Sequence, residues 1–165
     1  RARLVLSILV FGTCIGFYLL FNLPYIDDWS RTGEVLTGRF PDNPIEGVLN
    51  SEQPGFDGLV FLALPNCPYC FLAYPNLETL RKRVPDLDVV VFVSAVDTAG
   101  VGFFKEHVGE SDIPVHLISD REEATSLSNG KFPTFLYFKE GRVVYRWSNN
   151  QFGYPALDWV EHRLN

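Results

Sequence analysis

The spacing of hydrophobic and polar residues separates the chain into an apolar start and a mixed remainder. Residues 4–23 read LVLSILVFGTCIGFYLLFNL and contain no charged side chain. A helix rises about 1.5 Å per residue, so this run is long enough to cross a hydrocarbon core of about 30 Å. Arg1 and Arg3 precede the run, and the positive-inside tendency places that end in the cytoplasm. The pattern predicts a transmembrane anchor over residues 1–27.

Two other interpretations of the apolar start remain open. The first is a cleaved signal peptide, but the run is long for one and no small-x-small cleavage site follows it. The second is a lipoprotein anchor at Cys14, for which Phe11-Gly12-Thr13 is a poor lead-in. In a retained anchor, Cys14 is expected to be a small packing residue. Residues 28–54, with their glycines, prolines and mixed charges, are then predicted to form a linker.

The pattern changes after residue 54, and residues 55–165 are predicted to form one globular domain. Short apolar runs predict buried strands at 58–64, 89–93 and 115–118. Helical spacing predicts helices at 68–83, 98–108, 121–127 and 155–164. Two more strands, 134–139 and 142–147, flank Glu140-Gly141, a dipeptide that suits a tight hairpin turn. The fold class is therefore an α/β sandwich with a mixed sheet, preceded by one transmembrane helix.

Composition narrows the function classes. The hydrophobic fraction of 47% argues against disorder. The net charge of −6 argues against nucleic acid as the main partner, since phosphate binding needs a basic surface. The chain contains no methionine, so we expect it to be a fragment or a processed product.

The candidate chemistry lies in Asn66-Cys67-Pro68-Tyr69-Cys70, between a predicted strand and a predicted helix. A thiolate, not a thiol, attacks a disulfide, and a position at a helix start lowers the pKa of Cys67 toward ambient pH. Cys70 lies one helical turn further, close enough to close a ring with Cys67 and expel a bound substrate. Pro68 fits the first turn, which does not need its N–H. The spacing predicts a redox-active cysteine pair.

The CxxC motif has two alternative interpretations besides redox chemistry. Half of a zinc site is disfavoured because four ligands are usual, no second CxxC exists, and the histidines are scattered at positions 107, 116 and 162. A purely structural disulfide is disfavoured because so small a ring constrains the unfolded chain little. We therefore predict no metal site and no cofactor beyond the dithiol itself.

Several positions beyond the CxxC resemble the thioredoxin superfamily. Pro75, five residues after Cys70, matches the proline within the active-site helix of thioredoxins, and Phe132-Pro133-Thr134 resembles their cis-proline element. The resemblance implies that Pro133 packs beside the cysteines and that the Phe132 backbone pairs with substrate. Together with Pro68 and Tyr69, these residues are expected to position the substrate.

The long step from Cys67 to Pro133 leaves room for an extra helix and strand, here residues 98–118. This insertion resembles membrane-anchored proteins of the TlpA/ResA type, which act outside the bacterial cytoplasmic membrane, often as reductants. The end of the apolar segment also resembles, more faintly, the end of a DoxX/MauE-type membrane domain. These resemblances imply an extracytoplasmic domain on the periplasmic side, tethered to the membrane and re-reduced by a membrane electron donor.

Three positions depart from the family pattern. Asn66 stands where a tryptophan commonly precedes the first cysteine, Phe61 where thioredoxins have a buried acid, and Ala73 where TlpA/ResA-type proteins often have a glutamate. An acid at either of the last two positions would help to move a proton for Cys70. Three other acids are candidates for proximity to Cys70, namely Asp97, Asp120 and Glu140.

The leading functional hypothesis is an enzyme, a thiol–disulfide oxidoreductase acting on disulfides of extracytoplasmic proteins, as a reductant. In it Cys67 attacks, Cys70 resolves, and Pro133 and Phe132 position the substrate. The first alternative is a thioredoxin-fold module kept for protein docking, with incidental cysteines. The second is a copper metallochaperone, for which two thiolates would suffice as ligands, although no third ligand is evident near Pro133.

Overall fold

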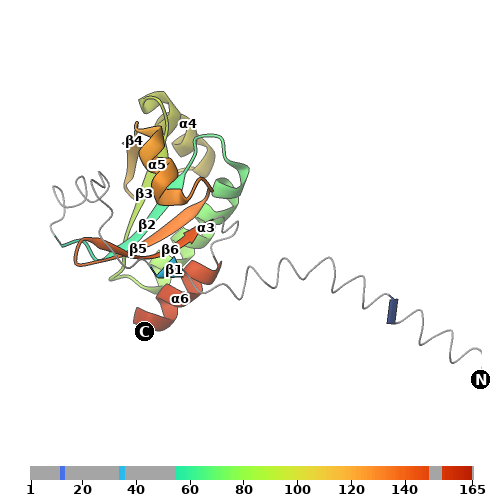
Figure 1. Ribbon diagram of the computed structural model, residues 1–165, viewed down its shortest axis with the longest axis vertical. Helices are drawn as coiled ribbons and strands as arrows, with labels where there is room; N and C mark the ends of the chain where they lie inside the picture. The colour runs from blue at the N-terminus through green and yellow to red at the C-terminus, as the bar shows by residue number, and fades with distance from the viewer. Residues whose placement is uncertain (1–11, 14–33, 36–54, 149–153, 165) are drawn as a thin grey trace, which may run out of the picture. The chain divides into compact units, whose positions relative to one another are not determined.

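A computed structural model describes residues 12–13, 34–35, 55–148 and 154–164, and the account below is confined to them (Figure 1). Gly12 and Thr13 are helical, but the rest of the predicted anchor, including Cys14, lies outside these residues. Within the described ranges, no helix combines the length and the apolar character that crossing a bilayer requires. Of the predicted linker, Glu34–Val35 is described and forms a short strand, β1.

The described part of the domain runs through the following elements in chain order: β1 (Glu34–Val35), β2 (Gly58–Ala63), α3 (Pro68–Arg83), β3 (Asp88–Ser94), α4 (Thr98–Val108), β4 (Val115–Ile118), α5 (Arg121–Ser128), β5 (Thr134–Lys139), β6 (Arg142–Ser148) and α6 (Tyr154–Leu164). From β2 onwards the elements match the predicted ones in type and order, with bounds that differ by one residue at most. The hydrophobic spacing was sufficient because the central strands β2, β3 and β5 are buried along nearly their whole length and each helix from α3 to α6 has buried residues.

The strands form one mixed sheet in the order β1-β6-β5-β2-β3-β4. β2 lies at its centre, parallel to β3 and antiparallel to β5, and β4 is parallel to β3. The predicted mixed sheet is therefore confirmed. The carboxyl ends of β2, β3 and β4 meet at one edge, which also receives the start of β5 because Thr134 pairs with Leu62.

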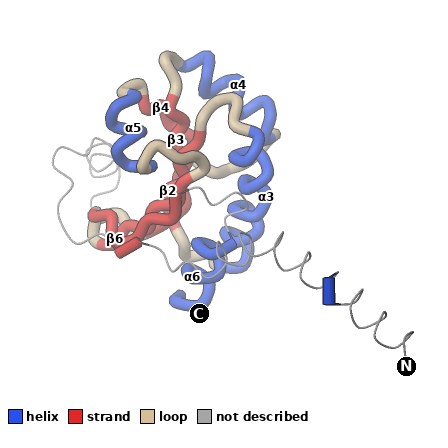
Figure 2. The backbone as a smooth tube through the Cα atoms, turned by 45° about the vertical axis from the view of Figure 1, so that its right-hand side comes forward, coloured by secondary structure: helices blue, strands red, loops and turns tan. Residues whose placement is uncertain are grey.

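Two hydrophobic cores cover the two faces of this sheet. Alternating β2 residues point to opposite faces, as the strand period requires. Leu59, Phe61 and Ala63 pack with buried residues of α3, α4 and α6, whereas Val60 and Leu62 pack with residues of α5. Figure 2 shows the result, with the strands between α5 on one side and α3 and α4 on the other. The central strand is therefore apolar along its whole length.

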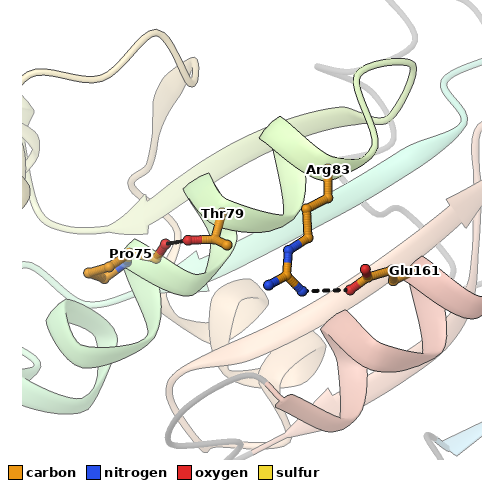
Figure 3. Close-up of polar contacts among 4 residues, drawn as sticks. All are labelled: Pro75, Thr79, Arg83 and Glu161. Atoms are coloured by element: carbon orange, nitrogen blue, oxygen red, sulfur yellow. Dashed lines mark hydrogen bonds and ion pairs between the residues drawn. The ribbon is translucent and has the colours of Figure 1, made fainter.

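Helix α3 continues through an internal proline. Pro75 has no N–H to donate, yet the helix runs on to Arg83. Thr79 Oγ1 donates to the Pro75 carbonyl at 2.8 Å, and an Arg83 Nη1–Glu161 Oε2 contact of 3.3 Å joins α3 to α6 (Figure 3). Both contacts are exposed, so each contributes little stability, and the buried residues of α3, which pack in the core with Leu59, Phe61 and Ala63, hold the helix in place.

The β5–β6 hairpin has the predicted two-residue turn. Glu140 and Gly141 both adopt positive φ angles, 51° and 74°, as a turn matched to the strand twist requires. The Glu140 N–H donates to the Asp57 carboxylate, and the Gly141 N–H donates to the Phe56 carbonyl at 2.9 Å. These bonds attach the turn to the residues just before β2.

Candidate redox site

The cysteine pair lies in the loop between β2 and α3. Cys67 and Cys70 are joined in a disulfide, with their Cα atoms 5.2 Å apart. Cys67 is the N-cap of α3 in an extended conformation, and the Cys70 N–H donates to Cys67 Sγ at 3.2 Å. A helix N-terminus with an N–H directed at sulfur favours a negative charge on that sulfur once the bond is reduced. The local geometry is therefore that of an attacking thiol.

The two cysteine residues differ in exposure. Cys67 retains 8% exposure, whereas Cys70 is fully buried among core residues of α3. Pro68 and Tyr69, between them, are exposed at the surface. A partner can therefore approach the pair only from the Cys67 side.

The predicted substrate-positioning loop lies at the same edge of the sheet. The Phe132–Pro133 peptide bond is cis. Thr134, the first residue of β5, pairs with Leu62 near the end of β2. Pro133 immediately precedes Thr134, so it lies at the end of β2 from which the cysteine loop emerges. Pro133 is buried and Phe132 half-buried against both cores. The fold thus brings Phe132 and Pro133 to the edge that carries the cysteines.

Side-chain and backbone contacts fix the shape of this loop. Asn129 and Gly130 end α5 with positive φ angles of 55° and 69°, which turns the chain back toward β5. The buried Thr134 hydroxyl lies 2.8 Å from the Lys131 carbonyl and 3.4 Å from the Ser128 carbonyl. One side chain therefore holds both the end of α5 and the approach to Pro133.

The departures noted in the sequence leave the pair with apolar neighbours. Phe61 and Ala73 are fully buried, and the Phe61 ring packs 4.9 Å from that of Phe135. Neither position can supply the proton-transferring acid expected from related proteins. Asn66, by contrast, is exposed beside Cys67.

The three candidate acids make structural contacts instead. Asp97 Oδ1 accepts from the Ala99 and Gly100 N–H groups at the start of α4. Asp120 similarly caps α5, and Glu140 occupies the hairpin turn. None of these contacts involves Cys70, although Asp97 lies on the wall of a hollow beside the cysteine loop.

That hollow was not predicted from the sequence. It has a volume of about 460 Å³ and lies where β2, β3 and β4 end. Its lining consists of two short segments, Leu64–Asn66 and Ser94–Asp97, and three further residues, Gly100, Ser119 and Arg121. The signal available in advance was topological, because concavities in sheets of this kind form at the carboxyl ends of parallel strands.

Four large hydrophobic side chains are exposed in the described ranges: Tyr69, Leu72, Val96 and Phe103. Tyr69 and Leu72 flank Cys70 on α3, Val96 follows β3, and Phe103 lies on α4. His107 of α4 joins this helix to α3, since its ring stacks on that of Phe71 with the ring centroids 5.0 Å apart. The ring of Phe103, one turn earlier on α4, lies tilted against His107 at a centroid distance of 4.1 Å.

The architecture of the domain is similar to that of several solved structures. No family model matches the chain, and no curated protein matches it either. Among solved structures, a thiol:disulfide interchange protein from Bacteroides sp. superposes with a TM-score of 0.52 at 17% identity, over 81% of this chain and 85% of that one. The thioredoxin domain of a thiol-disulfide oxidoreductase from Bacteroides vulgatus superposes with a TM-score of 0.51 at 17% identity, over 70% and 84%. The fold is thioredoxin-like.

A third similar structure is an uncharacterized thioredoxin-like protein from Porphyromonas gingivalis, with a TM-score of 0.52 at 17% identity over 67% of this chain and 76% of that one. At these identities the likeness concerns the fold. Within the thioredoxin-like fold of this chain, the evidence for chemistry comes from its own cysteines and from the contacts around them.

Proposed function

We propose that the protein is a thiol–disulfide oxidoreductase in which Cys67 is the attacking and Cys70 the resolving thiol. The observation that carries this proposal is the position of Cys67 as the N-cap of α3, with the Cys70 N–H on its sulfur at 3.2 Å. A merely structural disulfide does not require this placement. An attacking thiol gains from it, because it stabilises the thiolate.

The reaction proceeds in two exchanges, starting from the reduced pair. The Cys67 thiolate attacks one sulfur of a substrate disulfide, forms a mixed disulfide and releases the other substrate sulfur as a thiolate, which takes up a proton. The Cys70 thiol then loses its proton and attacks Cys67 Sγ, which releases the second substrate thiol. The substrate disulfide is reduced by two electrons, and the Cys67–Cys70 disulfide forms.

The physiological setting belongs to the proposal as well. The predicted anchor over residues 1–27 and the resemblance to TlpA/ResA-type proteins support a domain tethered outside the bacterial cytoplasmic membrane. There the pair acts as a reductant of protein disulfides and is re-reduced by a membrane electron donor. Apolar side chains at Tyr69 and Leu72, exposed by 47% and 53%, support protein substrates rather than small charged ones.

A redox-inactive docking module is the second candidate function. The buried Phe61 and Ala73, at positions where related proteins carry an acid, are the observation that favours it. Without such an acid, the Cys70 proton must leave by another route, so resolution of the mixed disulfide is the step in which the two functions differ most.

Trapping experiments separate the two functions. In Cys70→Ala the mixed disulfide at Cys67 cannot be resolved, so adducts should accumulate that vanish with reductant on non-reducing gels. Cys67→Ala serves as the matched control and should trap almost nothing, because Cys70 is fully buried. Pro133→Thr should prolong the mixed disulfide if the loop positions substrate. A docking module predicts no reducible adducts in Cys70→Ala and unchanged partner binding in Cys67→Ala, and that pattern would remove the oxidoreductase proposal.

A further inference from the structure

Strand β4 forms one edge of the sheet in the described part of the chain, with β3 as its neighbour on the other side (Figure 1). The Val91 N–H donates to the Pro114 carbonyl at 2.9 Å, and Val91 is the register partner of Val115. Successive residues of a strand direct their N–H and C=O groups to opposite sides, so those of Val115 and Leu117 point away from β3. Both residues are half-buried. This edge of β4 therefore offers backbone donors and acceptors at two positions to a further strand.

A cavity of about 480 Å³ lies beside the first residue of this strand. It is enclosed by the end of α4, by the loop that leads to β4 and by Tyr74 of α3, with apolar surface from Val108, Ile113 and Val115. The Tyr74 phenol oxygen is buried without a hydrogen-bond partner. A buried hydroxyl of this kind costs free energy, which a ligand that bonds it recovers. The volume falls within the range of ligand sites and is ample for one long side chain.

Val115 belongs both to the open edge and to the lining of the cavity. Residues that lie directly opposite each other in neighbouring strands point to the same face of the sheet. A residue that pairs with Val115 therefore directs its side chain to the face on which the cavity lies. In an antiparallel added strand, this residue exchanges two hydrogen bonds with Val115, and a second residue exchanges two with Leu117. The edge thus fixes a backbone, and the cavity receives one side chain.

The charges around the cavity select the chemistry of that side chain. Two carboxylates, Glu106 and Glu110, outnumber the one cation, Lys105. Helix α4 ends at Val108, so the carbonyl end of its dipole adds partial negative charge. The phenol oxygen of Tyr74 can accept a hydrogen bond from a charged N–H group. A lysine or arginine fits all of these features, because its apolar stem packs on the apolar lining while its charged end reaches the acceptors.

We propose that the open edge of β4 is a docking site for an extended segment of another protein, which adds to the sheet as an antiparallel strand and places a lysine or arginine side chain in the cavity. None of the residues that line the cavity belongs to the cysteine loop. The partner therefore binds at a place separate from the redox pair. This proposal does not rest on the proposed function, since the docking site exists whether or not the cysteines exchange disulfides.

The test titrates a labelled peptide with the 165-residue protein in mild detergent and follows fluorescence anisotropy. The probe is fluorescein-β-alanyl-Ser-Thr-Val-Lys-Val-Thr-Ser-amide, in which the central lysine is meant for the cavity. A second peptide carries glutamate in place of lysine. Two more carry a backbone N-methyl group, one on the lysine and one on the valine that follows it. When the lysine lies opposite Val115, its own N–H bonds to β4 and that of the next valine points away, so the second N-methyl peptide is the matched control.

We expect saturable binding of the lysine peptide with a Kd below about 1 mM. The glutamate peptide should bind at least about tenfold more weakly, because it places like charges together. N-methylation of the lysine should weaken binding at least about tenfold, whereas N-methylation of the following valine should weaken it less than about threefold.

Three protein variants test the cavity itself. Glu110→Gln should weaken binding of the lysine peptide about two- to fivefold, as the loss of one exposed ion pair allows. Glu122→Gln, which removes an exposed carboxylate of α5 outside the lining, makes the same change in net charge and should leave the affinity unchanged. Tyr74→Phe removes only the phenol oxygen and should weaken binding about three- to tenfold.

Four results would overturn the docking site: no saturable binding of the lysine peptide, equal affinities for the lysine and glutamate peptides, equal effects of the two N-methyl groups, or an unchanged affinity in both Tyr74→Phe and Glu110→Gln. Sedimentation of the protein alone tests for a different occupant. A dimer that excludes the lysine peptide would assign the edge to a second copy of the chain and would overturn the proposal as well. The trapping experiments at Cys67 are unaffected by any of these outcomes.

Discussion

Replacing Gly100 by alanine should destabilise the domain, whereas the same replacement at Gly102, two residues further along α4, should stabilise it. Both residues are helical, so alanine gains about 0.8–1 kcal/mol of helix propensity at either position. Their surroundings differ. A Cβ at Gly100 would lie 2.5 Å from Ala95 Cβ and 3.1 Å from Pro65 Cγ, whereas a Cβ at Gly102 meets nothing within 4 Å. The difference between the two variants therefore isolates the packing of α4 against Ala95, which follows β3, and against Pro65, in the loop before Cys67.

The expected size follows from the cost of overpacking, about 1–3 kcal/mol for an added methyl group in a well-packed site. Gly102→Ala should raise the free energy of unfolding by about 1 kcal/mol relative to the wild type. The free energy of unfolding of Gly100→Ala should be about 1–3 kcal/mol lower than that of Gly102→Ala. Pro65 is two residues before Cys67, so the forced shift should also change the rate of disulfide reduction in Gly100→Ala alone.

Urea unfolding of the oxidised protein measures these differences through the midpoint, provided that the slope with denaturant is unchanged. The rate at which dithiothreitol reduces the Cys67–Cys70 disulfide gives the second measurement. Equal stabilities and equal reduction rates for the two variants would refute the reasoning. They would mean that α4 can move away from Pro65 at no cost and does not support the site.

Two further predictions concern buried hydroxyl groups. Thr134→Val keeps the shape of the side chain but leaves the Lys131 carbonyl without its hydrogen-bond partner, so it should lower the free energy of unfolding by about 1–2 kcal/mol. Thr134→Ser keeps the hydroxyl and should lower it less. The midpoints of urea unfolding compare the two variants. Tyr74→Phe should cost nothing or stabilise by up to about 1 kcal/mol, because the phenol oxygen is buried without a hydrogen-bond partner. A loss of more than 1 kcal/mol at neutral pH would show that the phenol is paired after all.

The Tyr74 prediction has a pH dependence. Burial raises the pKa of Tyr74. A folded-state pKa above the unfolded value of about 10 means that the stability is fully present below that pH and is lost as the pH rises through the folded value. Wild-type stability should therefore fall more steeply above pH 10 than that of Tyr74→Phe, and parallel alkaline curves would contradict it.

The elements could be predicted from the sequence because each of them depends on short-range signals. Buried strands such as β3 read as unbroken apolar runs, Cys67-Pro68 marks a helix start, and Glu140-Gly141 marks a turn. The order of the strands in the sheet does not follow from such signals. Pairing of Thr134 with Leu62 joins residues far apart in the chain, and only that pairing brings Pro133 to the edge where the cysteine loop begins.

The surface around the site was harder to foresee for the same reason. Val96 is one apolar residue in a polar loop, and nothing in its neighbours along the chain distinguishes it from an ordinary exposed valine. Asp97 looked like a candidate proton carrier because of its residue type. Its role as the N-cap of α4 depends on where that helix begins, and a capping residue uses its carboxylate locally.

The central place of β2 determines how the protein responds to making and breaking its disulfide. Gly58–Ala63 pairs with β3 along its whole length and with β5 along nearly all of it, and both faces of the strand are covered. Its amide hydrogens should be among the last to exchange with solvent, since their release requires the sheet itself to open. The cysteine loop, by contrast, lies beyond the end of the paired strand. Making or breaking the disulfide is then a local event, and the pairing of β2 should be the same in the oxidised and the reduced protein.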